Sequence, residues 1–519
     1  MEALAYELPL QEGYEQSRQS FEGVVERLDS EEARLMTHSE LERELEKMGR
    51  DLMRQLLQDH LDLRGSGETE GPVQGVDGTR RTQVRIHERK LETIFGTVTV
   101  DRAGFPRKGE KSLHPLDGEL NLPPERYSLD LRRRVAEEAA KSSFDETLAS
   151  IGKSTGGHVP KRQTEELAMR AAKDFDAFYE MRQADGTREI TPGAFLVISV
   201  DGKGVVMRTE DLREQTRKAA QAREHKMTTR LSKGEKKNAK RMATVAAVYT
   251  IDPLGRQPED IITPKNPETP TPPRPRPQDK RVWASIEKTP EEVIEQAFRE
   301  AACRDPAREK TWVALVDGNQ TQIRILRRMA KKKGIELTII VDIIHVIEYL
   351  WDAGRVFCPE SGQELEDWVQ TRLLNVLYGK AGYVAGGMRR SATRRNLDAK
   401  TRKPVDDCAR YLLNHTSYLK YTDYLAQGMP IATGVIEGAC RHLVKKRMEV
   451  AGARWSLAGA EAVLRLRALR SSHDFDAYWC FHEAQEHKRN HQASYANGVV
   501  PATQPPPRHG RRPHLKKIK

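Results

Sequence analysis

The sequence predicts an α/β fold, because strand-like and helical segments alternate through its central part. Four apolar runs have the length and composition of buried strands, at residues 195–207, 243–252, 311–319 and 335–342. Helical patterns lie between and after the later runs, at residues 291–303, 321–334 and 345–357. Successive strand–helix units favour a largely parallel sheet with helices on its faces.

Composition argues against a membrane protein and against a secreted one. The 519 residues are enough for about three domains at roughly 150 residues each. No stretch approaches the ~20 apolar residues of a membrane helix, and the acidic start MEALAYELPLQEGYEQ lacks the order of a secretory signal. The five cysteines form no Cys-x-x-Cys pair, which is typical of reduced thiols. We therefore expect a cytoplasmic protein.

Charge is unevenly distributed along the chain. The formal net charge is +11, yet residues 1–78 hold 19 acidic and 8 basic residues, a net of −11. The rest of the chain therefore carries +22. Such a surplus indicates a polyanionic partner, first of all nucleic acid; the alternative is a soluble enzyme with a basic isoelectric point.

The first 78 residues are predicted to be an acidic helical region and a linker. Leucines and Met48 recur at helical spacing over residues 14–63, and a Gly-rich acidic segment follows at 64–79. Because the segment is acidic, we expect it to mediate interaction or dimerisation rather than DNA binding.

Residues 79–127 are predicted to form a β-hairpin module, because LETIFGTVTVDRAGF (91–105) alternates in a strand-like way between glycines. Residues 128–189 then contain three helical segments, the last two separated by a Gly-Gly turn. This pattern favours a helix-turn-helix with residues 160–174 as the recognition helix. Lys161, Arg162 and Gln163 would lie at its DNA-contacting end. An ordinary three-helix bundle is the alternative.

Two strand-like runs end in Asp-Gly. Asp201 ends VISVD and Asp317 ends VALVD, each followed by glycine. The carboxyl edge of a parallel-type sheet is where such folds hold ligands; one such pair alone is more often a turn. Glu437, in the helical segment GVIEGACRHLVKKRM, supplies a third carboxylate, and Arg441 and Lys445 share its helical face. Three carboxylates suit two Mg²⁺ ions, which Mn²⁺ can replace, in phosphodiester chemistry.

The order SVDGKG, LVDGNQ and VIEGACRHLVKKRM, with spacings of about 116 and 120 residues, resembles bacterial insertion-sequence transposases, and most closely the ISKra-type family. An Asp-x-x-His motif (Asp342, His345) and Arg454-Trp455-Ser456 follow as in Mutator-like and related transposases. The resemblance covers most of residues 80–480. It implies an RNase H-like catalytic domain, a mixed sheet flanked by helices, over residues 190–470, with an all-α insertion at about 359–430.

The resemblance also implies roles for individual residues. Asp201, Asp317 and Glu437 would be the catalytic, metal-binding triad, with Asp342 and His345 as an auxiliary pair. Asp342 is the rival of Asp317 for the second carboxylate, and His345 is either a general base or a structural histidine. Arg441, Lys445, Arg454 and Trp455 would contact DNA. Residues 471–519 are predicted to be a helix end and a basic disordered tail, since no acidic residue follows Glu486.

The function predicted on this basis is DNA transposition in the bacterial nucleoid. The protein, as a homo-oligomer on double-stranded DNA, would bind terminal inverted repeats, cleave the DNA and transfer the strand into target DNA, with two Mg²⁺ ions per active site. Two alternatives stay open: an inactive transposase-derived DNA-binding regulator, and a metal-dependent nuclease without strand transfer.

Overall fold

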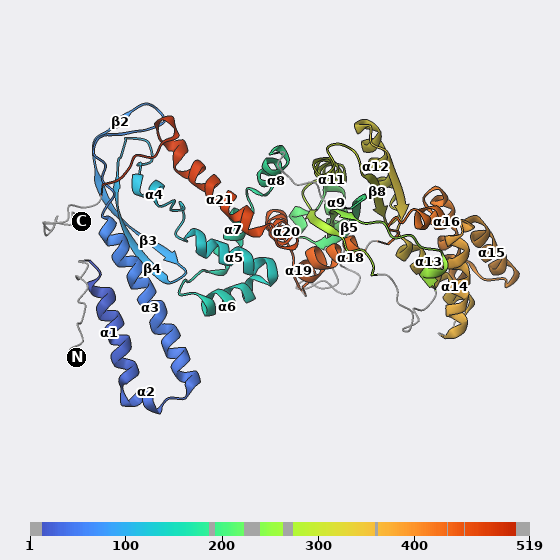
Figure 1. Ribbon diagram of the computed structural model, residues 1–519, viewed down its shortest axis with the longest axis horizontal. Helices are drawn as coiled ribbons and strands as arrows, with labels where there is room; N and C mark the ends of the chain where they lie inside the picture. The colour runs from blue at the N-terminus through green and yellow to red at the C-terminus, as the bar shows by residue number, and fades with distance from the viewer. Residues whose placement is uncertain are drawn as a thin grey trace, which may run out of the picture. The chain divides into compact units, whose positions relative to one another are not determined.

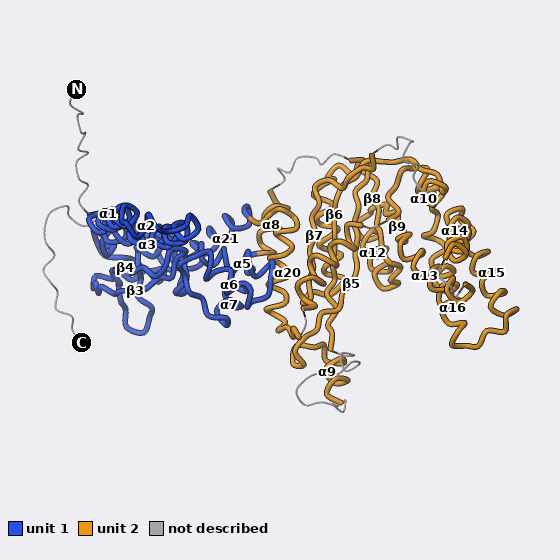
Figure 2. The backbone as a smooth tube through the Cα atoms, turned by 90° about the horizontal axis from the view of Figure 1, so that it is seen from below, with its two compact units in different colours: residues 1–174, 476–519 blue, residues 175–475 orange. Residues whose placement is uncertain are grey.

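The structure is a computed structural model, and it describes residues 13–185, 193–222, 239–262, 273–358, 362–432, 434–450 and 452–504. The chain divides into two compact units, one made of residues 1–174 and 476–519 and the other of residues 175–475 (Figure 2). Within the described ranges, no helix has both the length and the apolar character needed to cross a bilayer.

The first unit begins with three helices, where the sequence predicts one over residues 14–63. They are α1 (Glu15–Asp29), α2 (Glu31–Leu35) and α3 (His38–Arg64) (Figure 1). Ser30 has extended backbone and its side chain accepts a hydrogen bond from the Ala33 N–H. Thr37 is also extended, and its N–H donates to the Glu40 carboxylate at 2.8 Å. Capping side chains favour new helix starts, so the chain turns at these two residues.

The hairpin predicted around residues 91–105 is present and longer than expected. It consists of β3 (Arg85–Thr93) and β4 (Gly96–Gly104), which pair antiparallel. A separate short pair joins β1 (Val73–Gln74) to β2 (Arg80–Arg81). The alternating residues Leu91, Val98 and Val100 are buried and pack against Leu57 and Leu61 of α3. The hairpin is therefore half-covered by the helical hairpin that precedes it.

The predicted helix-turn-helix region forms three helices that contact one another, an arrangement shared by both interpretations of that segment. They are α5 (Leu129–Lys141), α6 (Phe144–Ser154) and α7 (Lys161–Ala171), and the short α4 (Pro115–Glu119) precedes them. Leu131, Val135, Ile151 and Leu167 form their shared core.

The disordered tail predicted for the end of the chain is wrong for the described residues up to 504. Helix α21 (Phe475–Asn490) belongs largely to the first unit, and two short turns, η4 (Gln492–Ser494) and η5 (Ala496–Gly498), follow it. Tyr495 is buried with Phe105 and Leu113. The basic charge of this segment did not predict its order, because order comes from packing of the aromatic Tyr495 side chain against the core of the first unit. The most basic part of the predicted tail, residues 505–519, lies outside the described residues.

A buried ionic network holds α21 in this unit. The fully buried Arg132 guanidinium donates to the Glu486 carboxylate at 2.7 Å and contacts the His482 Nε2 atom at 3.1 Å, and it also pairs with Glu125. Burial opposes ionisation of Asp174, yet hydrogen bonds from His482 and Arg489 hold the pKa of this carboxyl down to about 2. Its stabilising effect is therefore present above the ordinary Asp pKa near 3.8 and is lost as the pH falls toward 2.

The second unit contains the predicted α/β sheet. Its strands are β5 (Phe195–Val206), β6 (Lys240–Ile251), β7 (Gln278–Ser285), β8 (Thr311–Val316) and β9 (Leu337–Val341), in the order β7-β6-β5-β8-β9. Strands β5, β8 and β9 are parallel, whereas β6 pairs antiparallel with both β5 and β7. The sheet is therefore mixed, as the family resemblance implies, whereas the largely parallel sheet expected from strand–helix alternation alone is wrong. Sequence patterns also missed β7, because its first half is polar and partly exposed at the sheet edge.

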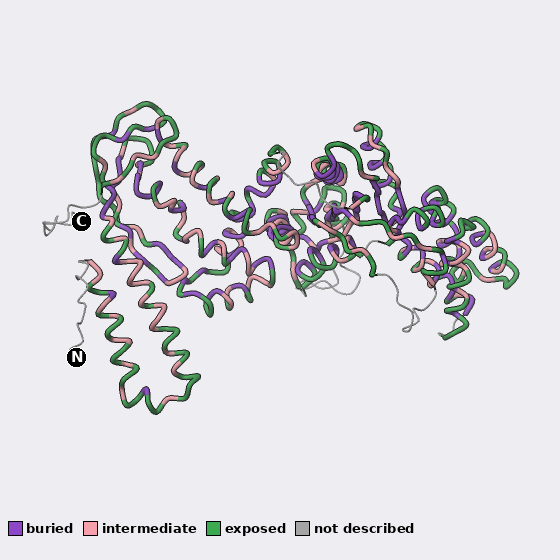
Figure 3. Tube along the Cα trace, viewed as in Figure 1, coloured by how far each residue is buried: buried purple, intermediate pink, exposed green. Residues whose placement is uncertain are grey.

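The other elements of this unit are mainly helices, some of which flank the sheet while others pack on one another. They are α8 (Phe175–Ala184), α9 (Glu214–Gln221), α10 (Glu259–Ile262), α11 (Pro290–Arg304), α12 (Gln320–Lys333), α13 (Ile343–Phe357), α14 (Gln363–Leu377), α15 (Ala381–Arg394), α16 (Ala399–Asn414), α17 (Tyr421–Ala426), α18 (Gly434–Ala439), α19 (Lys446–Met448) and α20 (Leu457–Ser471). Successive residues of β5, β6 and β8 are buried without alternation (Figure 3). Because side chains alternate between faces, both faces of the sheet are covered.

We predict that Arg132→Met destabilises the first unit by about 3 kcal/mol, because it leaves two buried glutamates short of a partner. Arg133→Met is the matched control: Arg133 is adjacent but partly exposed and pairs with Glu137 at 3.1 Å, so its loss should cost no more than about 1 kcal/mol. Urea unfolding followed by circular dichroism measures both. Equal stability of the two variants would contradict a stabilising role for the network.

Candidate active site

Three aspartates lie side by side at one edge of the sheet. The parallel register pairs Val200 of β5 with Val316 of β8, and Val316 with Val341 of β9. The next residue on each strand is an aspartate, namely Asp201, Asp317 and Asp342. Neighbouring strands are ~4.8 Å apart, so the backbone brings these three positions together. The structure thus joins two predicted catalytic residues and one predicted auxiliary residue.

Asp201 does not end its strand, contrary to the sequence interpretation. Strand β5 continues to Val206, paired with β6. What ends at Asp201 is the pairing with β8, and the burial of β5 falls from complete to partial at the same residue. The carboxylate is therefore half-buried at the point where β5 leaves its parallel neighbour. Its Oδ1 atom accepts a hydrogen bond from the Gly202 N–H at 2.6 Å.

The loop that carries Asp317 is held by the helical insertion. The Tyr411 hydroxyl of α16 donates to the Asp317 carbonyl at 2.8 Å, and the His415 Nε2 atom lies 2.8 Å from the Gly318 carbonyl. Gly318 has φ +93°, and a Cβ atom there would lie 3.0 Å from the Tyr411 ring. The Asp-Gly sequence is thus required by a left-handed backbone under a close aromatic contact.

Asp342 and His345 occupy the start of α13. The Asp342 carboxylate is buried and accepts a hydrogen bond from the Ile344 N–H at 2.8 Å, as a helix N-cap does. Asp317 is less buried than Asp342, so of the two carboxylates Asp317 is the one that a metal ion can reach more easily. The His345 Nδ1 atom lies 3.1 Å from the Glu348 carboxylate.

Electrostatics couple the carboxylates. The pKa of Asp317 is raised above its ordinary value, mainly because the carboxyl group is buried. A hydrogen bond from the Asn319 N–H and the nearby His345 oppose this increase, whereas the Asp201 carboxylate adds to it. Two acidic side chains therefore face each other in a partly desolvated site, where like charges oppose one another. A bound cation would relieve this repulsion, and carboxylate oxygens are the donors that hard divalent cations prefer.

Glu437 reaches this edge through its helix. Helix α18 contacts β5 and β6, and the Cys440 thiol, three residues after Glu437, lies 3.0 Å from the Asp201 Oδ2 atom. Burial, followed by the nearby Asp201, raises the pKa of the Cys440 thiol, so the thiol is protonated and donates. Glu437 lies about one helical turn before Cys440, on the helix that contacts β5 and β6. Glu437 itself is exposed.

Cys440 is the site residue that sequence reasoning missed. It begins a π-helical turn, η3 (Cys440–Lys445), which continues α18. The Arg467 guanidinium of α20 donates to the Leu443 carbonyl at 2.9 Å and also to the His442 carbonyl, which satisfies carbonyl groups of this turn. Single π-turns inside helices are rare and frequent at functional sites. In the sequence, only the three-residue separation of Glu437 and Cys440, which puts both on one side of a helix, could have indicated that Cys440 belongs to the site.

The three predicted catalytic carboxylates do not form a closed metal cage. Among the described residues, one trio of ligand-type side chains has its atoms within 4.8 Å of one another, and it is Asp174, His482 and Glu486. That trio already pairs with Arg132 and Arg489, so it needs no cation. Asp201 and Asp317 are close enough to interact electrostatically, whereas Glu437 is exposed.

Of the predicted DNA-contacting residues in this unit, Arg441, Lys445 and Arg454 are exposed. Trp455 is not available for that role. Its side chain is 5% exposed, its indole N–H donates to the Met448 carbonyl at 3.2 Å, and its backbone bridges to the end of β5. The segment of residues 454–456 instead pairs with the end of β5 through Trp455, so the tryptophan has a role in packing against the sheet.

The residues predicted at the start of the recognition helix lie where expected. Helix α7 begins at Lys161, directly after Pro160. Lys161 and Arg162 are exposed and Gln163 is half-buried. The Lys161 ammonium pairs with Asp145 at 2.6 Å, and Arg162 with Glu166 at 3.3 Å. Both ion pairs are solvent-exposed, so they are weak and can be exchanged for contacts with a phosphate.

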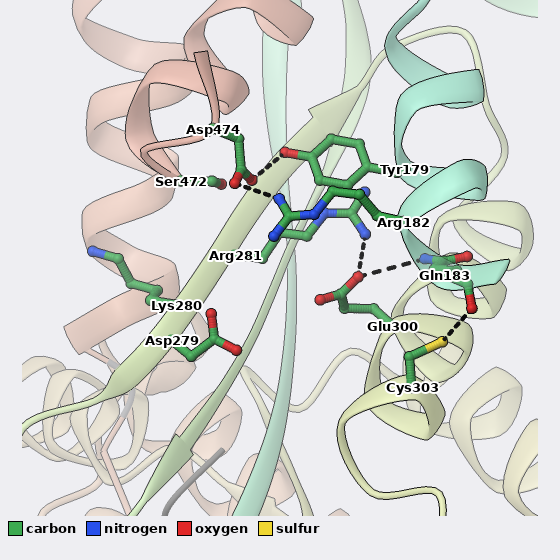
Figure 4. Close-up of a pocket in the computed structure, with 10 residues that line it drawn as sticks. All are labelled: Tyr179, Arg182, Gln183, Asp279, Lys280, Arg281, Glu300, Cys303, Ser472 and Asp474. Atoms are coloured by element: carbon green, nitrogen blue, oxygen red, sulfur yellow. Dashed lines mark hydrogen bonds and ion pairs between the residues drawn. The ribbon is translucent and has the colours of Figure 1, made fainter. Parts of the chain in front are cut away.

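A polar pocket elsewhere in this unit has a structural role (Figure 4). The Arg281 guanidinium lies 3.4 Å from the centre of the Tyr179 ring and pairs with Glu300 at 2.6 Å, while the Tyr179 hydroxyl donates to Asp474 at 2.8 Å. The cavity of about 20 Å³ has room for one water molecule. These contacts fix α8 and the end of α20 to the edge strand β7.

Comparison with known proteins gives partial similarities. No family model matches the chain. The "UPF0236 protein in vanSb 3'region" of Streptococcus gallolyticus is 29% identical over 126 residues, which is 23% of this chain and about a quarter (26%) of that protein. The Drosophila P element transposase strand transfer complex aligns at 9% identity with a TM-score of 0.22, covering 68% of this chain and 79% of that one.

We predict that Gly318→Ala destabilises the second unit by about 1–3 kcal/mol, because alanine disfavours the left-handed backbone and its Cβ meets the Tyr411 ring. Gly382→Ala on exposed α15 is the control, since nothing lies within 4 Å of a Cβ there, and alanine favours a helix. Urea unfolding followed by tyrosine and tryptophan fluorescence measures both. A Gly318→Ala protein as stable as the wild type would show that neither the left-handed backbone nor the close Tyr411 ring requires glycine at this position.

Proposed function

We propose that this protein is a DDE transposase that catalyses metal-dependent DNA cleavage and strand transfer. The observation that carries this proposal is the adjacency of Asp201 and Asp317, at equivalent positions of two parallel strands. The helix that bears Glu437 is joined to this pair by the Cys440–Asp201 hydrogen bond. Three carboxylates from two neighbouring strands and a helix that contacts one of those strands would supply a ligand set for phosphodiester chemistry.

In this proposal Asp201 and Asp317 hold Mg²⁺ ions, and Glu437 completes the ligand set. The half-buried oxygens and the repulsion between the two aspartates fit hard divalent cations better than any softer metal. Two such ions, when bound, activate the attacking oxygen and stabilise the leaving one. Asp342 supports the site by fixing the start of α13, and His345 stands next to Asp317.

The substrate in this proposal is double-stranded DNA. Arg441 and Lys445 of η3 and the nearby Arg454 are exposed, and in this proposal they contact phosphates during cleavage. In the other unit, the start of α7 would contact base edges of the element's ends. Terminal repeats would thus be recognised by one unit and cut by the other.

The same proposal extends to the type of domain and the transposase family. The mixed sheet would be an RNase H-like domain with a helical insertion over residues 363–426, and the chain an ISKra-type insertion-sequence transposase that acts as a homo-oligomer in the bacterial nucleoid. A regulator without catalysis, and a nuclease without strand transfer, are the alternative functions that the assays below separate from it.

The deciding experiment is cleavage of DNA carrying the element's ends, with Mg²⁺ or Mn²⁺. We predict that Asp201→Asn, Asp317→Asn and Glu437→Gln each lower cleavage more than about a hundredfold, since even outer-shell partners of metal ligands are worth 10–100-fold. DNA binding should persist in all three. Asp352→Asn, an exposed carboxylate on α13, is the control that should cleave normally. Normal cleavage by any triad variant removes that residue from the site.

Products separate the three functions. Joined product with a target duplex supports a transposase, cut ends that are never joined indicate a nuclease, and binding without any cleavage by the wild type indicates a regulator.

Cys440 provides a finer test of the same site. We expect Cys440→Ala to need more Mn²⁺ for half-maximal cleavage, because the Asp201 carboxylate loses the donor that orients it. Cys440→Ser keeps a donor and should restore much of the wild-type metal dependence. A Mn²⁺ titration of cleavage compares the variants. The same metal requirement in Cys440→Ala and wild type would show that the thiol does not position Asp201.

A further inference from the structure

Helix α3 carries a basic stripe inside the acidic first region. Arg43, Lys47, Arg50 and Arg54 follow one another at intervals of four, three and four residues. This spacing places all four on one face of the helix, over a length of about 16 Å. Residues 1–78 are net negative, yet this face of α3 carries four cations against two neighbouring carboxylates, Glu46 and Asp51.

The same face of α3 changes character along its length. Toward its end, Leu57 and Leu61 pack on the β3–β4 core, and the Gln58 side chain bonds both backbone groups of Thr99, with its Oε1 atom 2.8 Å from the amide nitrogen. At Arg54 the helix reaches the tip of the hairpin, since the Arg54 Cδ atom lies 3.1 Å from the Cβ position of Gly96. Beyond that tip the helix extends past the sheet (Figure 1). The face is therefore apolar where it is covered and basic where it is not.

A cleft of about 490 Å³ lies along the basic stripe. Its walls are the stripe on α3 with the neighbouring carboxylates Glu46 and Asp51, the hairpin tip at Phe95–Thr97, and Gly156 in the turn between α6 and α7. Four cations and two carboxylates therefore line it, so its charge is net positive. Arg50 fixes the walls together, because its guanidinium donates to the Thr155 carbonyl at 3.1 Å and to the Lys153 carbonyl at 2.6 Å. The cleft thus has a defined shape and opens beside the turn that precedes α7.

The remaining cations of the stripe are available to a ligand. Arg50 is paired with Glu46. Within the part of the chain that the structure describes, Arg43, Lys47 and Arg54 have no carboxylate within the 4.0 Å that defines an ion pair. Arg43 and Lys47 are exposed and Arg54 is half-buried. Phe95 is the one large apolar side chain among the lining residues, so the cleft suits a polyanionic backbone better than an apolar peptide.

We propose that this cleft, which we call the α3 groove (Arg43, Glu46, Lys47, Arg50, Asp51, Arg54, Phe95–Thr97 and Gly156), binds the phosphate backbone of duplex DNA. The choice of DNA as the polyanion rests on the proposed function. The groove adjoins the turn before Lys161, so a strand held there lies next to the start of α7. The N-terminal helices would then be part of the DNA-binding surface rather than an acidic accessory.

The test measures binding of the full-length protein to a labelled duplex of random sequence, without divalent metal so that cleavage does not contribute. The variant carries Arg43→Gln, Lys47→Gln and Arg54→Gln, and retains Arg50 because it holds the groove together. Each lost phosphate contact reduces the slope of log K against log salt by about 0.9. We expect a slope shallower by about two to three, with weaker binding at low salt.

A control with the same loss of charge carries Arg324→Gln, Lys331→Gln and Lys332→Gln on the exposed face of α12. A larger loss of slope in the groove variant than in this control supports the proposal. Equal losses would mean that only net charge matters, and an unchanged slope would mean that the groove does not touch DNA; either overturns it. Because cleavage is not measured, the groove can fail while the catalytic proposal stands, and the reverse also holds.

Discussion

The parallel register of β5, β8 and β9 is the constraint on which the candidate active site depends. Three strands that end their shared pairing at Val200, Val316 and Val341 necessarily present the following residues in one row. Those residues are all aspartates, although they are separated by 116 and 25 positions in the chain. A shift of one residue in the pairing of β8 would turn Asp317 to the opposite face. Burial of both faces of β5 and β8 opposes such a shift.

The helical insertion follows from this constraint. A carboxylate placed after a strand on a short loop needs support if it is to stay near another negative charge. Helix α16 gives that support with two side chains, Tyr411 and His415, which bind the carbonyls of Asp317 and Gly318. Tyr349 of α13 stacks on Tyr411, with ring centres 4.2 Å apart. The insertion is therefore joined to the loop by hydrogen bonds and aromatic packing.

The other unit uses charge in two distinct ways. Arg132 is fully buried and pairs with the nearby Glu125 and with Glu486 of the distant α21, so it contributes to the packing of that helix. The basic side chains on the exposed half of α3 are mostly unpaired and line a groove. Composition cannot separate these uses, because an arginine counts equally in both. Burial and partners decide which charges stabilise the fold and which can meet a ligand.

The sequence by itself determined the alternation of strands and helices, the hairpin around residues 91–105, the helical character of 363–426 and the candidate carboxylates. These are local properties, set by apolar periodicity, turn residues and Asp-Gly pairs. Tertiary structure alone decided which strands pair antiparallel, that β7 is an edge of the sheet and that β5 continues beyond Asp201, because strand partners are chosen by contacts between distant segments. It also decided that Trp455 is buried, that Cys440 meets Asp201 and that residues 475–504 pack into the first unit. Each of these depends on which surfaces cover one another, and no pattern within a single segment encodes that.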